Sequence, residues 1–343
     1  MFKENEYRLT SQVKIHGWSC KLGPDNLENL LQRTGLAGDI EDSAVIPILN
    51  TNMVLVKNLD IFTPIIDEPE IQGEITACNV TNDIFAMNVP EINGGMLIFL
   101  AINTNTPTEI AEGILNGIKH FMENKINSKV VGGHTIYCDW PLMGGEASSI
   151  VDKDIIIRKS GVKEGDKLVL SKPIGLQGVM AAYRVLKEFP EILETYSNTE
   201  LQKSIDIAVK VMTTPNQDVV KAIHSFKDFS FVHAMSDITG FGLAGHTKEL
   251  LQHSNLSAII ERVPSINLSR ELSADLGYAF EECRAHETAG GMLLAIDNKM
   301  IEEFTNTLSS YNVPNWIVGT IDKKKSGVVR VADDVEFLEI TKY

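Results

Sequence analysis

Met96-Leu-Ile-Phe-Leu-Ala-Ile102 and Thr106-Pro-Thr-Glu109 decide the fold class of this sequence. The first stretch is a continuous apolar run, short enough for a buried strand. The second has the pattern of a capping box, with proline at the first helical position. The apolar residues that come next recur on one face of a helix: Ile110, Ile114, Ile118 and Phe121. A buried strand followed at once by an amphipathic helix predicts a sheet covered by helices.

The same alternation continues on both sides of this stretch. Strands are predicted near 45–49, 53–56, 129–131, 154–157, 167–170, 230–235, 257–261, 291–296, 316–321 and 327–331. Further helices are predicted near 176–188, 199–212, 216–226, 241–253 and 299–310. The polar, glycine-bearing segment 159–166 lacks periodicity and marks a domain boundary. We expect two domains of α+β or α/β architecture, 46–158 and 159–343, after an N-terminal segment, 1–45, in which Gly17–Lys21 is mobile.

The composition excludes several classes of function. The 343 residues contain 31 Lys and Arg against 46 Asp and Glu, a formal net charge of −15. A chain without an excess of cations does not suit the phosphate backbone of nucleic acids. No apolar run approaches the roughly 18 residues of a membrane span, and the four cysteines are scattered, as in reducing compartments. We expect a cytoplasmic soluble protein without nucleic-acid or membrane partners.

Four carboxylates stand where α/β proteins place ligands, at strand ends and loop starts. Asp42 comes just before a predicted strand, Asp60 ends one, and Asp237 ends another before a glycine-rich turn. Asp83 lies in a predicted helix, with Asn79 four residues earlier on the same face. A hard divalent cation needs carboxylate oxygens gathered from separated elements. The alternative is that each acid caps a helix or turn, and sequence spacing does not decide between the two.

Gly240-Phe-Gly-Leu-Ala-Gly245 matches the fingerprint of dinucleotide-binding proteins. A predicted strand precedes it, a helix follows, and Glu261 lies about twenty residues on, where a ribose-binding acid belongs. This pattern makes an NAD-dependent oxidoreductase a competing hypothesis. The position of Asp237 argues against it, because a carboxylate so close would repel a pyrophosphate unless a metal ion lay between them.

Three further motifs carry weaker signals. Gly132-Gly-His-Thr135 follows a predicted strand and offers backbone N–H groups and a hydroxyl to a phosphate. Cys20-Lys21 places a thiol beside an ammonium group, which lowers a thiol's pKa, although a packed cysteine next to a surface lysine has the same sequence. Cys283 and His286 have a metal-like spacing, but no second pair accompanies them, which disfavours zinc.

Taken together, these motifs resemble the selenide, water dikinases (selenophosphate synthetases), in the ATP-using superfamily of aminoimidazole ribonucleotide synthetase. The resemblance runs from Arg8 to about Thr320. It is carried most specifically by 60–67, 78–87, 131–135, 170–175 and 234–246. In that family the last stretch supplies a metal-binding aspartate and not a dinucleotide loop.

The resemblance implies a fold, a reaction and a set of site residues. The fold has an N-terminal α+β domain that dimerises through its sheet, with ATP near the dimer interface, and a C-terminal α/β domain. The reaction converts ATP, selenide and water to selenophosphate, AMP and phosphate. Mg²⁺ would be held by Asp42, Asp83 and Asp237, with Asn79. ATP would be contacted by Lys21, Asp60, Asp83, Gly133, His134 and Thr135. Lys21 and Cys20 would be the catalytic residues.

The sequence departs from the family pattern in two places. The family has Cys or selenocysteine, one residue, Cys and Lys near its N-terminus, and Trp18 occupies the position of the first. The segment 284–291 also differs from the usual Asp-Pro-Gln-Thr-Ser-Gly-Gly pattern. Two alternatives therefore stay beside selenophosphate synthesis: an ATP enzyme acting on another small anion such as sulfide, and a nucleotide-binding paralogue with a regulatory role.

Overall fold

The computed structural model describes residues 7–36, 38, 39, 41–324 and 326–343. The first sheet has five strands in the order β1-β2-β5-β3-β4. These strands are β1 (Ala44–Pro47), β2 (Met53–Phe62), β3 (Gly95–Ile102), β4 (Val130–Tyr137) and β5 (Leu142–Asp152). Neighbouring strands run antiparallel except β3 and β4, which are parallel. Because β4 is the last strand in this order, it forms an edge of the sheet.

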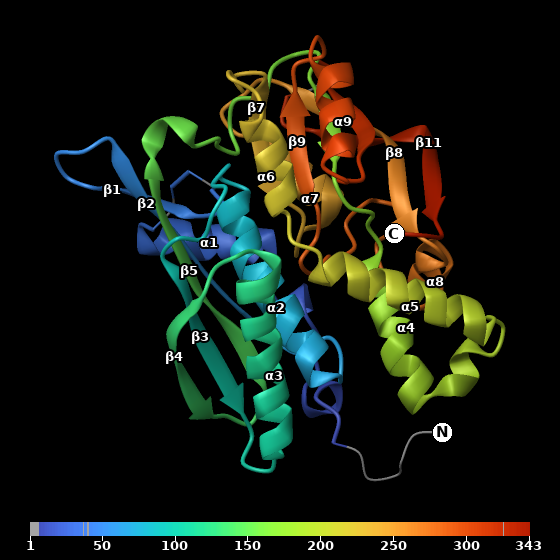
Figure 1. The fold of residues 1–343 in the computed structure, drawn as a ribbon. Coiled ribbons are helices and arrows are strands. Elements are labelled where there is room, and N and C mark those ends of the chain that lie inside the picture. The colour runs from blue at the N-terminus through green and yellow to red at the C-terminus, as the bar shows by residue number, and fades with distance from the viewer. Residues whose placement is uncertain (1–6, 37, 40, 325) are drawn as a thin grey trace.

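Two helices cover one face of this sheet. The helix α2 (Pro69–Phe85) packs against β2 and β5, and α3 (Thr108–His120) packs along α2, while α1 (Pro24–Thr34) precedes the sheet in the chain (Figure 1). The two packed helices approach closely because glycine stands at their contact. A Cβ atom on Gly117 would lie 1.9 Å from the carbonyl oxygen of Glu70, and one on Gly73 would lie 2.1 Å from that of Ile114.

The second half of the chain forms a second sheet with its own helices. Its six strands are ordered β11-β8-β10-β6-β9-β7. They are β6 (Lys167–Leu170), β7 (Val232–Asp237), β8 (Ser257–Ile266), β9 (Met292–Ile296), β10 (Trp316–Asp322) and β11 (Val329–Ile340). The helices are α4 (Leu176–Glu188), α5 (Asn198–Thr213), α6 (Gln217–His224), α7 (Gly242–Leu250), α8 (Ser269–Asp275) and α9 (Ile301–Ser310). The expected fold class, two parts that each combine a sheet with helices, is confirmed.

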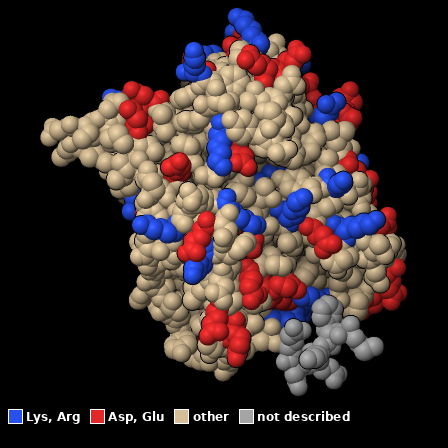
Figure 2. Space-filling view, in the orientation of Figure 1, with Lys and Arg blue, Asp and Glu red and all other residues tan. Residues whose placement is uncertain are grey.

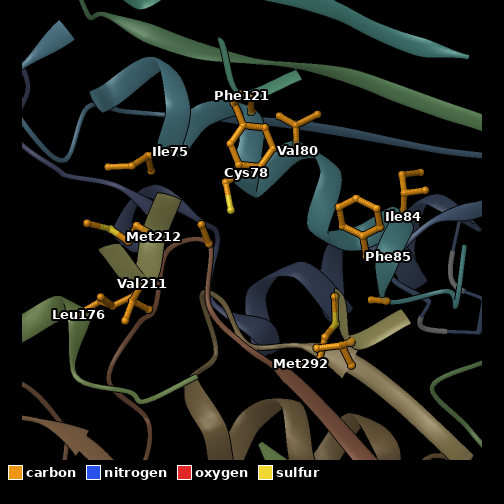
Figure 3. Packing of buried hydrophobic residues seen from close by; sticks show 14 of the residues in the cluster. Ile75, Cys78, Val80, Ile84, Phe85, Phe121, Leu176, Val211, Met212 and Met292 are labelled. Atoms are coloured by element: carbon orange, nitrogen blue, oxygen red, sulfur yellow. The ribbon is translucent and has the colours of Figure 1, made fainter. Parts of the chain in front are cut away.

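The helix α2 is buried between the two halves of the molecule. It lies between the first sheet and the C-terminal helices in Figure 1. Its apolar side chains, such as Ile75 and Phe85, belong to one continuous core with Val211 and Met212 of α5 and with Met292 of β9 (Figure 3). This shared core fixes the position of α2 relative to both sheets.

Two local predictions were wrong. The helix α3 begins at Thr108 and not at Pro107, and no side chain caps it. The capping box fails because the Thr106 hydroxyl lies 2.9 Å from the Tyr7 hydroxyl and donates to Asn103 Oδ1 at 3.3 Å. These contacts hold the Thr106 hydroxyl, and it makes no cap hydrogen bond to the helix amides.

The strand predicted at 154–157 is also absent. A 3-10 turn spans Lys153–Ile155 instead, because the Asp152 carboxylate accepts a hydrogen bond from the Asp154 amide at 2.9 Å. Asn52 Nδ2 donates to the same carboxylate oxygen at 2.7 Å and holds it in place.

On the face that Figure 2 shows, Lys and Arg side chains are interspersed with Asp and Glu, and no broad patch of Lys and Arg forms. Within the described part of the chain, no helix has the length and apolar character needed to cross a membrane.

The contact between α2 and α3 gives a test of the fold. In an exposed helix, Gly→Ala is favourable by about 1 kcal/mol. At Gly117 the added methyl group meets backbone instead, so we expect Gly117→Ala to lower the free energy of unfolding by about 1–3 kcal/mol. Urea denaturation followed by circular dichroism measures this change. The control is Asn116→Ala, at an exposed position on the same helix; equal stability of the two variants would contradict the packing described.

Candidate functional site

Three aspartates from distant parts of the chain meet at the junction of the two halves. Asp42 precedes β1, Asp83 lies in the last turn of α2, and Asp237 ends β7. One carboxylate oxygen of each lies within 4.8 Å of the others. Asp60, near the end of β2, is within hydrogen-bonding reach of Asp83. The alternative that each acid only caps a local turn therefore does not describe them.

The low-dielectric surroundings of these acids disfavour their charged forms. Burial raises the pKa of Asp42 to about 6, where the Lys159 ammonium opposes the shift and Asp237 adds to it. Burial likewise raises the pKa of Asp60 to about 7, opposed by Lys21. For Asp83, burial and three neighbouring carboxylates all act in the same direction, so its pKa lies well above the usual value. Complete ionisation of the cluster is therefore costly unless a positive charge compensates it.

The cluster fits a hard divalent cation. Asp42 Oδ2 and Asp237 Oδ2 are buried oxygen atoms without a hydrogen-bond partner within the described part of the chain. Such atoms are costly to bury unless something compensates their charge. Carboxylate oxygens gathered at this spacing are the ligands that Mg²⁺ or Ca²⁺ prefers.

A buried lysine that the sequence did not single out compensates part of this charge. Lys159 Nζ lies 2.7 Å from Asp42 Oδ1 and 2.7 Å from Glu249 Oε2, and its side chain is only 5% exposed. Glu249 Oε2 also contacts His246 Nδ1 at 3.0 Å, and His246 Nε2 accepts a hydrogen bond from the Thr239 amide. The chain of contacts joins Asp42 to the turn after Asp237. Lys159 looked like a surface residue because it lies in the polar segment 159–166.

The N-terminal segment closes over the site. Trp18 is 7% exposed, packs its ring 5.8 Å from that of Phe62, and donates from Nε1 to Asn79 Oδ1 at 2.6 Å. Lys21 Nζ lies 5.0 Å from the Trp18 ring centre and 4.7 Å from that of Phe241. The charge of Lys21 acts on Asp60, Asp83 and Asp237, so its ammonium group faces the carboxylates. Cys20 is half-buried beside it. The expected mobility of Gly17–Lys21 stays a prediction.

Asn79 does not offer an oxygen to the carboxylate cluster in this structure. Its Oδ1 accepts from Trp18 Nε1 and, at 3.0 Å, from the Ala289 amide, while its Nδ2 donates to Asp60 Oδ2 at 2.9 Å. Asn79 therefore orients Asp60 and anchors the N-terminal segment.

Gly133, His134 and Thr135 are separated from the carboxylates. We expected them in a loop after a strand, but they lie within β4, on the exposed edge of the first sheet. Residues Asp60, Gly145, Ile98 and Gly133 pair in one row across four strands. Three strand spacings place Gly133 about 14 Å from Asp60 along this row.

The topology around Gly240–Gly245 is not that of a dinucleotide-binding fold. The strand before it, β7, is an edge strand that pairs only with antiparallel β9, whereas the fingerprint requires a parallel βαβ unit. The glycines instead allow neighbouring groups to approach the backbone closely. A Cβ on Gly240 would lie 2.9 Å from Lys21 Cδ, and Gly242 adopts φ +66° with a Cβ position 2.7 Å from the Ala285 carbonyl oxygen.

The comparisons with known proteins agree with this architecture. Residues 40–152 match the AIR synthase related protein, N-terminal domain, and residues 163–332 match the corresponding C-terminal domain. Thiamine monophosphate kinase from Aquifex aeolicus has the same fold, with a TM-score of 0.67 and 17% identity over 93% of this chain and all of that chain. A HypE–HypF complex gives a TM-score of 0.69 and 17% identity, over 90% of this chain and 96% of that chain. The fold and the paired domains define an AIR synthase-related protein.

Relatives with more similar sequences identify the family within this class. The selenide, water dikinase of Methanococcus maripaludis is 35% identical over 96% of this chain and 100% of its own length. That of Methanocaldococcus jannaschii is 35% identical over 97% of this chain and 98% of its own. The chain belongs to the selenide, water dikinase family.

The raised pKa values predict a pH dependence of stability. The folded pKa values of Asp42 and Asp60, about 6 and about 7, lie above the unfolded value of about 3.9. A carboxyl group with a raised pKa favours the fold while it is protonated, so this contribution is complete below about pH 4 and is lost as the pH rises to about 7. With EDTA, the melting temperature should therefore fall between pH 5 and pH 8.

Added Mg²⁺ should reverse this fall, because a cation that replaces the protons stabilises the charged carboxylates. We expect the increase in melting temperature on adding Mg²⁺ to be larger at pH 8 than at pH 6, and to be lost in Asp83→Asn. An increase that is the same at both pH values, or that survives in Asp83→Asn, would contradict the proposed role of the cluster.

Proposed function

We propose that the protein makes selenophosphate, converting ATP, selenide and water to selenophosphate, AMP and phosphate. The observation that carries this proposal is the meeting of Asp42, Asp83 and Asp237 within 4.8 Å, in a chain with the two domains of its family. Phosphoryl transfer needs little covalent help from a protein and depends on positioning and on neutralising charge. The site supplies both, and the four free cysteines support a reducing, cytoplasmic location.

Each residue of the site has a place in this reaction. Asp42, Asp83 and Asp237 would hold Mg²⁺, which supplies charge neutralisation for the polyphosphate when bound. The charge of Lys21 acts on the same carboxylates, and Lys21 would neutralise the phosphate oxygens. Lys159 holds Asp42 in position through its ion pair, and Asn79 holds Asp60. The Trp18 and Phe241 rings on either side of Lys21 limit the positions its ammonium group can take.

A second copy of the chain would complete the enzyme. Side chains on the outer face of the first sheet, away from α2, are exposed although apolar: Leu59, Leu97 and Ile150 are 65%, 43% and 46% exposed. They share this face with the Lys57–Glu146 ion pair, because Glu146 lies between Leu59 and Leu97 across the strands. Exposed apolar side chains gathered on one sheet face favour association. Because Gly133–Thr135 lie on the exposed edge of the same sheet, we propose that they reach the nucleotide at the interface of a homodimer.

The metal assignment is tested by Asp83→Asn. The substitution keeps the shape of the side chain and removes one charge from the cluster, so ATP turnover should fall about a thousandfold, as the loss of about 4 kcal/mol of transition-state stabilisation requires. The matched control is Glu70→Gln, which removes a charge from an exposed position on the same helix. Turnover of Asp83→Asn at the rate of the control would remove the cluster from the mechanism.

The N-terminal segment is tested by two adjacent substitutions. The Trp18 indole offers one N–H donor and no thiolate, and selenide is itself an anion near neutral pH. We therefore expect Cys20→Ser to keep a substantial fraction of ATP turnover with free selenide, and Lys21→Ala to lose nearly all of it. Lys14→Ala, an exposed lysine of the same segment, serves as control. If Cys20→Ser is as inactive as Lys21→Ala while ATP still binds, the thiol is catalytic.

The products identify the acceptor. Incubation with ATP, Mg²⁺ and either selenide or sulfide, followed by ³¹P NMR, should give AMP, phosphate and a phosphorus–selenium species with selenide. A phosphorus–sulfur product formed faster than the selenium product would move the function to sulfide. No AMP with either anion would favour the regulatory paralogue.

A further inference from the structure

A small cavity borders Trp18. It has a volume of about 20 Å³ and opens between the N-terminal segment and helix α4. Its polar lining comes from both halves of the chain: His16, Ser19, Gln177, Arg184, His286 and Thr288. The mechanism proposed above uses none of these side chains.

The cavity carries the positive charge of Arg184, on which the carboxylates of Glu188 and Asp67 act from beyond ion-pair distance. Arg184 donates to the Met180 carbonyl oxygen at 2.9 Å and to the Tyr278 hydroxyl, both uncharged acceptors. No carboxylate among the described residues forms an ion pair with it. The nearby Arg8 is different, since its guanidinium pairs with Asp67 at 2.9 Å and Glu188 at 3.3 Å. A guanidinium group keeps its charge at all relevant pH values, so Arg184 attracts an anion.

The two imidazoles add neutral hydrogen-bonding groups. Ser19 Oγ accepts from Gln177 Nε2 at 3.2 Å and lies 3.3 Å from His286 Nδ1. His16 Nε2 lies 2.9 Å from the Thr10 carbonyl oxygen and must donate to it, so Nδ1 of His16 keeps its lone pair. Burial lowers the pKa of both rings, that of His16 to about 4.

The size of the cavity selects among anions. A volume of about 20 Å³ holds a group about the size of one water molecule, so a phosphate or a nucleotide does not fit. The cationic side chain that lines the cavity is that of Arg184.

We propose that this cavity binds the acceptor of the reaction as a hydrogen chalcogenide anion, HSe⁻ or HS⁻, with Arg184 as the residue that holds its charge. The inference rests on the proposed function and specifies where the second substrate of that reaction binds. Such an anion has one heavy atom, a negative charge that suits Arg184 and one proton that the Nδ1 lone pair of His16 accepts. It also accounts for Trp18, because an anion held by charge needs no protein sulfur at that position.

The test measures binding separately from turnover. Sodium hydrosulfide and sodium selenide are titrated anaerobically into the protein without ATP, with sodium phosphate as a third arm, by calorimetry. We expect one hydrosulfide or hydroselenide per chain and no phosphate. In Arg184→Met, the dissociation constant and the KM for selenide should rise about 10- to 100-fold, the effect of losing a charge-assisted hydrogen bond. The KM for ATP should stay unchanged.

Two further variants keep the test decisive. Arg184→Lys retains the charge and should retain most of the binding, which a purely structural role of the guanidinium would not allow. Arg262→Met, on the surface of β8, removes a distant positive charge and should change nothing. If anions bind but no selenophosphate forms, the proposed function fails and the cavity assignment stands. If Arg184→Met binds and uses selenide like the wild type, or if phosphate binds in its place, the cavity assignment is overturned.

Discussion

Repulsion among the buried aspartates is the constraint on which the rest of the structure depends. Two unit charges 4.8 Å apart repel by about 3 kcal/mol at an effective dielectric of 20, and here several acids share one space. Three features reduce this repulsion. Lys159 forms an ion pair with Asp42, and the positive charge of Lys21 lies near Asp60. The raised pKa values of Asp42 and Asp60 favour their uncharged, protonated forms. Each of these effects is partial, and the proposed Mg²⁺ ion would complete the neutralisation.

The same constraint explains why the site needs both halves of the chain. Asp60 comes from a strand of the first sheet, Asp83 from α2, and Asp237 from an edge strand of the second sheet. The shared core around α2 sets the distance between these elements. The N-terminal segment then spans the junction, since Trp18 contacts Asn79 through its ring and Thr288 through its backbone amide. The packing of the two halves against each other therefore also brings the site residues together.

The sequence predicted most of the regular elements because their apolar residues are periodic, as in α3, or form short buried runs, as in β3. Strand ends and loop starts marked Asp42, Asp60 and Asp237 as candidates, but their spacing did not show that they meet Asp83, and only the family resemblance grouped Asp42, Asp83 and Asp237. Prediction from the sequence failed where tertiary contacts override a local pattern. Thr106 has the residue type of a cap but bonds to Tyr7, and the glycines near 240 match a fingerprint but make room for Lys21 and Ala285. Lys159 and Arg184 were missed because only the folded chain shows which charge each one faces.

The burial of α2 has a consequence for synthesis of the protein. During translation the helix leaves the ribosome with the first sheet, but one of its apolar faces is covered only by residues such as Val211, Met212 and Met292. At typical rates of about 5–20 residues per second, the intervening roughly two hundred residues take about 10–40 s to appear. For that time the nascent chain presents an uncovered hydrophobic helix. Transiently exposed hydrophobic surface of this kind is where aggregation begins and where chaperones bind.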